Sequence, residues 1–180
     1  VDYASSNGTA TAGADYTASS GTLTFAAGTT TQTFTVPVLA DSTDEANETA
    51  TLTLSNASNA SISDATGTLT ITDDDAAPSL SINDVTTSNE NAANATFTAT
   101  LSAASGQQVT VDYASSNGTA TAGADYTASR GTLTFAAGTT TQTFTVPVLA
   151  DSTDEANETA TLTLSNATNA NISDATGTLT

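Results

Sequence analysis

The chain of 180 residues contains 19 acidic residues and one basic residue, Arg130, which gives a formal net charge of −18. Such a charge repels nucleic-acid phosphates and anionic membrane surfaces and attracts cations. Cys, His and Lys are absent, which excludes disulfides, thiolate metal sites and the usual bases of a serine nucleophile. No apolar run is long enough to span a bilayer. We therefore expect a non-catalytic protein with no nucleic-acid partner and no direct membrane insertion.

Alternation of polar and apolar residues with a period of two dominates the beginning of the chain. It runs through residues 22–25, 33–36 and 51–54, where Thr alternates with Leu, Phe or Val. Turn-forming pairs separate these runs, as at Asn7-Gly8 and Ala27-Gly28. We expect a strand in each run and no helix, because no segment of ten residues combines helical spacing with caps.

The following segment marks a boundary between two units. An alternating run at 68–72 ends in Asp73-Asp74-Asp75, then comes Ala76-Ala77-Pro78, and a new pattern starts at Ser79. We therefore divide the chain into two parts. Residues 1–75 are the C-terminal part of one repeat, and residues 76–180 are a nearly complete second repeat that lacks its closing Asp run.

From residue 111 onward the chain repeats its own beginning. Residues 111–180 match residues 1–70 with only three differences, which are Ser20/Arg130, Ser58/Thr168 and Ser61/Asn171. The repeating unit is the size of a domain and too long for one turn of a solenoid. Such similarity indicates either a recent duplication within a longer array or a designed consensus.

The second unit is predicted to hold seven strands, near 79–86, 94–101, 107–114, 131–135, 141–149, 158–165 and 176–180. Short strands at this spacing are typical of a two-sheet sandwich. The predicted fold class is therefore all-β, with tandem immunoglobulin-like, seven-stranded antiparallel β-sandwiches. Leu, Val, Phe and Tyr would fill the core, while Thr and Ser would face water.

Most acidic residues cluster in predicted loops or at strand ends. Crowded carboxylates repel one another, and a hard divalent cation relieves that repulsion. Calcium binds 6–8 oxygen ligands in a flexible geometry, whereas magnesium requires a stricter octahedron. Zinc prefers His and Cys ligands, which this chain lacks. The clusters therefore favour Ca²⁺ as the cofactor, and the alternative is that these acids are solvated charges that keep the protein soluble.

The same loops carry sequence blocks that resemble the Calx-beta family. The matching blocks are Asn7–Tyr16, Gly21–Phe25, Asp41 with Glu45 and Glu48 ahead of Thr51–Ser55, and Ile71–Asp75. The resemblance covers essentially the whole chain, and it implies a seven-stranded sandwich with calcium sites at one tip. The ligands that it implies are Asp15, Asp41, Glu45, Glu48, Asp73, Asp74, Asp75, Glu90, Asp125, Asp151, Glu155 and Glu158.

The sequence also departs from the family's pattern. Calcium-sensing members often have consecutive acids where this chain has Ala40-Asp41 and Ala150-Asp151. This difference implies fewer ions or weaker binding. The first unit also lacks a counterpart of Glu90, and the second lacks a closing Asp run.

The expected function is that of a calcium-binding spacer, in which repeats joined by Ala76-Ala77-Pro78 form a rigid rod in a secreted or cell-surface protein, as in large bacterial adhesins. Its partners would be neighbouring repeats of the same chain. One alternative is an adhesive module that binds a host glycan or protein. Another is a filament-forming subunit that self-associates by sharing strands between chains, since a missing strand leaves an open sheet edge.

Overall fold

The computed structural model describes residues 1–88, 94–152 and 154–180, and every regular element in this part of the chain is a β-strand. The all-β prediction is confirmed. The chain forms two compact units. The first comprises Val1–Ser42 and Ala46–Asp74, and the second comprises Thr43–Glu45 and Asp75–Thr180. None of the described segments is a helix long and apolar enough to cross a membrane.

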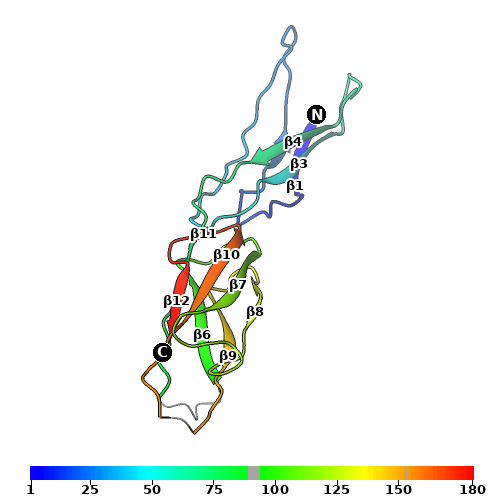
Figure 1. Ribbon diagram of the computed structural model, residues 1–180. Coiled ribbons are helices and arrows are strands. Elements are labelled where there is room, and N and C mark those ends of the chain that lie inside the picture. The colour runs from blue at the N-terminus through cyan, green and yellow to red at the C-terminus, as the bar shows by residue number, and fades with distance from the viewer. Residues whose placement is uncertain (89–93, 153) are drawn as a thin grey trace. The chain divides into compact units, whose positions relative to one another are not determined.

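The second unit is built from two four-stranded sheets (Figure 1). One sheet has the order β11-β5-β6-β9, formed by β5 (Ser79–Ile82), β6 (Asn94–Leu101), β9 (Thr141–Pro147) and β11 (Asn171–Ile172). The other has the order β12-β10-β7-β8, formed by β7 (Val109–Asn117), β8 (Arg130–Phe135), β10 (Ala160–Thr168) and β12 (Thr176–Leu179). Neighbouring strands are antiparallel except β11, which the sequence did not predict and which runs parallel to β5.

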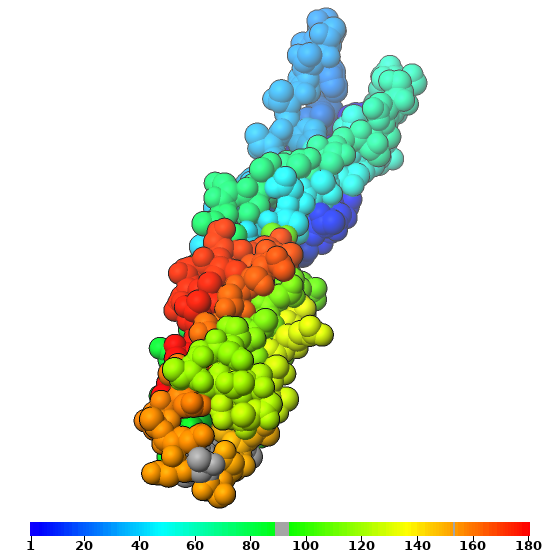
Figure 2. Space-filling model, in the orientation of Figure 1, coloured from blue at the N-terminus to red at the C-terminus, as the bar shows by residue number. Residues whose placement is uncertain are grey.

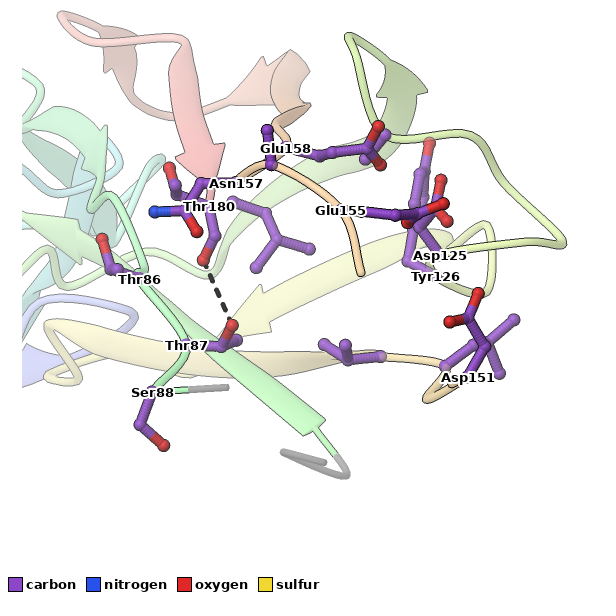
Figure 3. Close-up of a pocket in the computed structure, with 15 residues that line it drawn as sticks. Thr86, Thr87, Ser88, Asp125, Tyr126, Asp151, Glu155, Asn157, Glu158 and Thr180 are labelled. Carbon is purple, nitrogen blue, oxygen red and sulfur yellow. Dashed lines mark hydrogen bonds between the residues drawn. The ribbon is translucent and has the colours of Figure 1, made fainter. Parts of the chain in front are cut away.

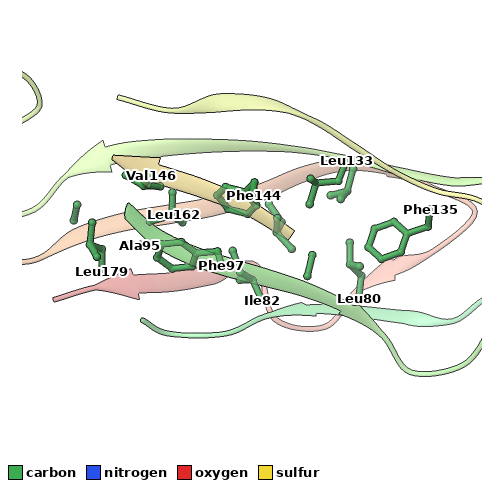
Figure 4. Close-up of a cluster of buried hydrophobic side chains, with 14 of the residues drawn as sticks. Leu80, Ile82, Ala95, Phe97, Leu133, Phe135, Phe144, Val146, Leu162 and Leu179 are labelled. Carbon is green, nitrogen blue, oxygen red and sulfur yellow. The ribbon is translucent and has the colours of Figure 1, made fainter. Parts of the chain in front are cut away.

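Alternation along the strands places the core between these two sheets. In β6, Ala95, Phe97, Ala99 and Leu101 are buried, while the Thr residues between them face outward. The ring of Phe144 in β9 stacks on Phe97 of the same sheet and, at 3.9 Å between ring centroids, on Tyr113 of the other sheet. Figure 4 shows the aromatic and aliphatic side chains of this core.

One short segment from earlier in the chain, Thr43–Glu45, belongs to the second unit. The Asp44 carboxylate is buried there and accepts a hydrogen bond from the hydroxyl of Ser105 at 2.8 Å. The Asp44 carbonyl also accepts bonds from the Ser105 hydroxyl and from the Gly106 amide. These bonds replace the water that the buried polar groups lose.

The first unit is a single sheet with the order β2-β1-β3-β4. Its strands are β1 (Asp2–Asn7), β2 (Ser20–Thr22), β3 (Glu48–Ser55) and β4 (Thr66–Ile71). The buried cluster of this unit consists of Ala10, Tyr16 and Ala50, with partly buried side chains around it.

Two strand predictions for the first unit are wrong. β2 ends at Thr22, so most of the run 22–25 is not a strand, and no strand forms at 33–36. The corresponding segments of the second unit are strands because β7 extends far enough to pair Thr134 and Phe135, and because β6 pairs with β9. Figures 1 and 2 show the segment 23–38 as a narrow arm that projects from the sheet of the first unit.

Candidate metal site

A tight turn presents the first carboxylate of the candidate site, that of Asp125. The Thr121 carbonyl accepts hydrogen bonds from the amides of Ala124 and Asp125, at 3.1 and 3.0 Å. In return, the Thr121 amide donates to the Asp125 carboxylate at 2.7 Å. Gly123 has a φ of 93°, a conformation that residues with a side chain rarely adopt. The turn therefore fixes the direction of the carboxylate through the backbone.

The next residue, Tyr126, anchors this turn to the rest of the unit. Its side chain is 1% exposed, and its hydroxyl donates to Oδ1 of Asn117, at the end of β7, at 2.8 Å. The same oxygen accepts the amide of Ala122 at 3.0 Å. On the other side, the Leu149 amide donates to the Asp125 carbonyl at 2.9 Å. Asp125 is therefore held between the ends of β7 and β9.

The other two carboxylates, Glu155 and Glu158, come from the acidic segment that precedes β10. Glu158 is adjacent to Thr159, whose amide donates to the Thr119 hydroxyl at 2.8 Å and whose carbonyl accepts the Ala120 amide at 2.9 Å. These bonds position Glu158, which is half-buried, while Glu155 is exposed.

One carboxylate oxygen from each of Asp125, Glu155 and Glu158 lies within 4.8 Å of the other two. At such separations two negative charges repel by about 1 kcal/mol in bulk water and by about 4 kcal/mol near a protein surface. Two oxygens bound to one calcium ion at 2.3–2.6 Å can be no more than about 5 Å apart. The three residues therefore already have the spacing of ligands that share one calcium ion.

These carboxylates face a cavity of about 390 Å³ (Figure 3). Asp151 also lines the cavity, although it is not one of the three grouped residues. Another part of the wall is formed by Thr87 and Thr180, where the Thr180 carbonyl accepts the Thr87 amide at 2.8 Å. The cavity has room for water molecules that would complete a coordination shell of 6–8 oxygens.

The first copy of the Asp turn has the same local structure. The Thr11 amide donates to the Asp15 carboxylate at 2.6 Å, and the Tyr16 hydroxyl donates to Oδ1 of Asn7 at 2.7 Å. The implied ligands Asp15, Asp41 and Glu48 belong to the first unit, whereas Glu45 belongs to the second.

The closing Asp run is divided in the same way, since Asp73 and Asp74 belong to the first unit and Asp75 to the second. The Asp73 amide donates to Oδ1 of Asn47 at 3.0 Å. Among the described residues, no group of three or more carboxylates within 4.8 Å of one another includes a member of the run Asp73–Asp75. The implied ligand Glu90 lies outside the described residues.

Sequence reasoning missed the residues that support the site. Asn117 binds both the turn and the Tyr126 hydroxyl, and Thr119 fixes the backbone beside Glu158. A signal for Asn117 is present in the sequence, because Asn117-Gly118 repeats the pair Asn7-Gly8, but that pair by itself predicts only a turn. Tyr126 is buried, in agreement with the prediction that Tyr residues fill the core.

The chemistry of the grouped side chains indicates which metal they could bind. All three grouped side chains are carboxylates, and the chain contains no His or Cys that would favour zinc or copper. Two of the three come from one loop segment and one from a rigid turn, a combination that suits the variable geometry of calcium better than the strict octahedron of magnesium. The residues present therefore fit a calcium ion.

Comparisons with known proteins agree with the all-β architecture. The chain is similar to the crystal structure of the apo form of the Calx CBD1 domain, with 22% identity and a TM-score of 0.52 over 57% of this chain and 95% of that chain. It is also similar to the crystal structure of CBD12 from CALX1.2, with 21% identity and a TM-score of 0.51 over 99% of this chain and 85% of that chain. The search of curated proteins found no match.

The family comparison covers nearly the whole chain. The model of the Calx-beta domain matches twice, at residues 1–75 and at residues 73–179. The two matches meet at the Asp run 73–75, where the composition of the sequence changes. The chain therefore belongs to the Calx-beta domain family.

Proposed function

We propose that the chain is a non-catalytic, calcium-binding repeat module. The observation that carries this proposal is the grouping of Asp125, Glu155 and Glu158 around one point beside a cavity. Membership in the Calx-beta family supports it, because the resemblance implies calcium ligands at these three positions. Of the other implied ligands in the second unit, Asp151 lines the same cavity, so it would bind calcium directly or through a water molecule.

Calorimetric titration with calcium tests this proposal. We expect Glu158→Gln to weaken calcium binding to the second unit at least about tenfold, because even the loss of a residue that only supports a ligand costs that much. Asp154→Asn is the matched control, since Asp154 is an exposed acid of the same segment outside the group. Equal affinities for the wild type and Glu158→Gln, or no heat of binding in either, would contradict a calcium site at these residues.

We further propose that repeats of this kind are immunoglobulin-like sandwiches, with the short β11 added to the seven strands that the sequence predicts. They would serve as rigid spacers in a secreted or cell-surface protein, with neighbouring repeats of the same chain as their partners. The near-identity of residues 1–70 and 111–180 supports a spacer, because selective recognition favours divergent surface loops. Small-angle scattering with and without a chelator tests the role of calcium. A maximum dimension and a melting temperature that stay the same after chelation would contradict a calcium-stiffened spacer.

A further inference from the structure

One side-chain oxygen joins both ends of the turn that carries Asp125. Oδ1 of Asn117, the last residue of β7, accepts the hydroxyl of Tyr126 at 2.8 Å and the amide of Ala122 at 3.0 Å. Ala122 precedes Asp125 in the chain and Tyr126 follows it. Asn117 does not line the cavity that the carboxylates face, so it acts on the candidate metal site only through this turn.

The hydrogen bonds inside the turn depend on the two ends that Asn117 holds. The Gly123 amide donates to the Tyr126 carbonyl at 2.8 Å, which closes the turn on its own backbone. The Thr121 amide donates to the Asp125 carboxylate at 2.7 Å and so directs that side chain. A residue that fixes both ends of the turn therefore also fixes the direction in which the Asp125 carboxylate points.

The same bonds recur in the first unit. Oδ1 of Asn7 accepts the Tyr16 hydroxyl at 2.7 Å and the Ala12 amide at 2.9 Å, and the Thr11 amide donates to the Asp15 carboxylate at 2.6 Å. The corresponding distances in the second unit are 2.8, 3.0 and 2.7 Å. Within residues 1–180 the two units have buried clusters of very different size. The bonds of the turn, rather than the core beneath it, therefore determine its geometry.

We propose that Asn117 is a positioning residue of the candidate calcium site, which holds the turn in its binding geometry before an ion arrives. This role rests on the proposed function, because it requires that calcium binds at Asp125. A ligand that is already ordered reduces the entropy that binding would otherwise cost. Without the Asn117 oxygen, the Tyr126 hydroxyl and the Ala122 amide would bond to water, and the turn would become ordered only when calcium binds.

Amide hydrogen exchange in the full 180-residue chain tests the order of the turn directly. Asn117→Leu removes the oxygen but keeps a side chain of similar size. In the calcium-free variant we expect the Thr121 and Ala122 amides to lose protection, and saturating calcium to restore it. NMR resolves the two copies, so the Ala12 amide is an internal reference that should not change. The Leu164 amide, which makes a backbone hydrogen bond in the second unit, reports whether that unit is still folded.

Calorimetry then measures the effect on binding. Asn117→Leu should weaken calcium binding to the second unit at least about tenfold, as the loss of groups that support metal ligands usually does. Asn117→Asp keeps an acceptor oxygen at the same place and adds a charge that attracts cations, so it should restore both the protection of Ala122 and at least the wild-type affinity. Asn171→Leu is the matched control, since Asn171 is exposed in β11 and does not line the cavity.

Tyr126→Phe is a milder variant for the case in which Asn117→Leu also loses the protection of Leu164 and is therefore unfolded. It removes one of the two donors and leaves the bond between Ala122 and Asn117 in place. Protection of the turn and calcium affinity should both fall, by less than in Asn117→Leu.

The outcomes separate this role from the proposed function. A wild-type chain that binds no calcium would refute the calcium site itself, and the positioning role with it. If the wild type binds calcium, the role alone is overturned by wild-type affinity in a folded Asn117→Leu variant, or by protection of Ala122 that persists without the Asn117 oxygen. A Tyr126→Phe variant that matches the wild type in both measurements, or an Asn117→Asp variant that restores neither, would overturn it as well.

Discussion

Gly118 illustrates how one residue without a side chain positions the candidate metal site. A Cβ atom at this position would overlap the carbonyl oxygen of Thr159. That carbonyl accepts the amide of Ala120, and the residue before Thr159 is the grouped carboxylate Glu158. The close approach of the two backbone segments therefore determines where Glu158 lies relative to Asp125.

We predict that Gly118→Ala lowers the free energy of unfolding of the second unit by about 1–3 kcal/mol, because the two backbones must separate to make room. Calcium binding should weaken together with stability, since Glu158 would move. Gly67→Ala is the control, because the nearest atom to a Cβ there is 3.9 Å away, an ordinary contact. Chemical denaturation and calorimetry measure both effects, and a Gly118→Ala variant as stable as the wild type would contradict the prediction.

At the scale of elements, an exposed hydrogen-bond network links three strands of the second unit. The Asp112 carboxylate in β7 accepts the hydroxyl of Thr132 in β8 at 2.6 Å and the side-chain amide of Asn166 in β10 at 3.0 Å. These two bonds, that from Thr132 above all, hold the pKa of Asp112 below its ordinary value of 3.8. The first unit has the same network around Asp2, with Thr22 and Asn56.

The lowered pKa predicts a dependence of stability on acid. Because the folded-state pKa of Asp112 is below the unfolded value, its stabilising contribution is present above pH 3.8 and is lost as the pH falls through the lowered pKa. Asp112→Asn should therefore make the acid decline in the stability of the second unit shallower. Asp2→Asn should do the same for the first unit only, and acid titration of both variants by circular dichroism compares them.

The two copies of the sequence TQTFTVP, at 31–37 and 141–147, offer a second prediction at this scale. Phe144 is 7% exposed and stacks on both Phe97 and Tyr113, whereas Phe34, in the identical local sequence, is half-buried and stacks on Tyr3. Phe144→Ala should destabilise the second unit by about 3–5 kcal/mol, as is usual for a buried Phe. Phe34→Ala should destabilise the first unit by less, and equal losses in denaturant unfolding would argue against the difference in burial.

At the scale of the whole molecule, the two units differ in core size and should unfold separately. The second has a continuous core between two sheets, while the buried cluster of the first contains only Ala10, Tyr16 and Ala50 among the described residues. Small cores provide little stability, so in a polypeptide of residues 1–180 alone the first unit should unfold at the lower temperature. Phe144→Ala assigns the transitions, because it should lower only the higher one.

Calcium should then raise the transition of the second unit. A ligand at a hundred times its dissociation constant stabilises the folded state by about 2.7 kcal/mol if it does not bind the unfolded chain. Thermal scans with calcium and with a chelator measure the shift. In the Glu158→Gln variant the higher transition should respond little to calcium, and a shift of wild-type size in that variant would place the binding elsewhere.

Much of this molecule could be predicted from its sequence. The period-two alternation of Thr with Leu, Phe and Val predicts an all-β chain, since side chains on a strand point alternately to opposite faces. The repeated blocks around Asp125 and Glu158 indicated the family and the acids of the candidate site. These signals are local, because each depends only on residues close together in the chain.

Tertiary structure alone decided which of the alternating segments form strands and which of the acidic residues lie close together. TQTFTVP is a strand at 141–147 but not at 31–37, because a strand needs a neighbour for its backbone hydrogen bonds and, within residues 1–180, only the second copy has a β6 to pair with. In the same way, Asp125 is grouped with Glu155 and Glu158 only because Asn117, Tyr126 and Thr119 bring separate segments together. Such partners lie far apart in the chain or outside the local pattern, so the sequence could name the carboxylates but not the spacing between them.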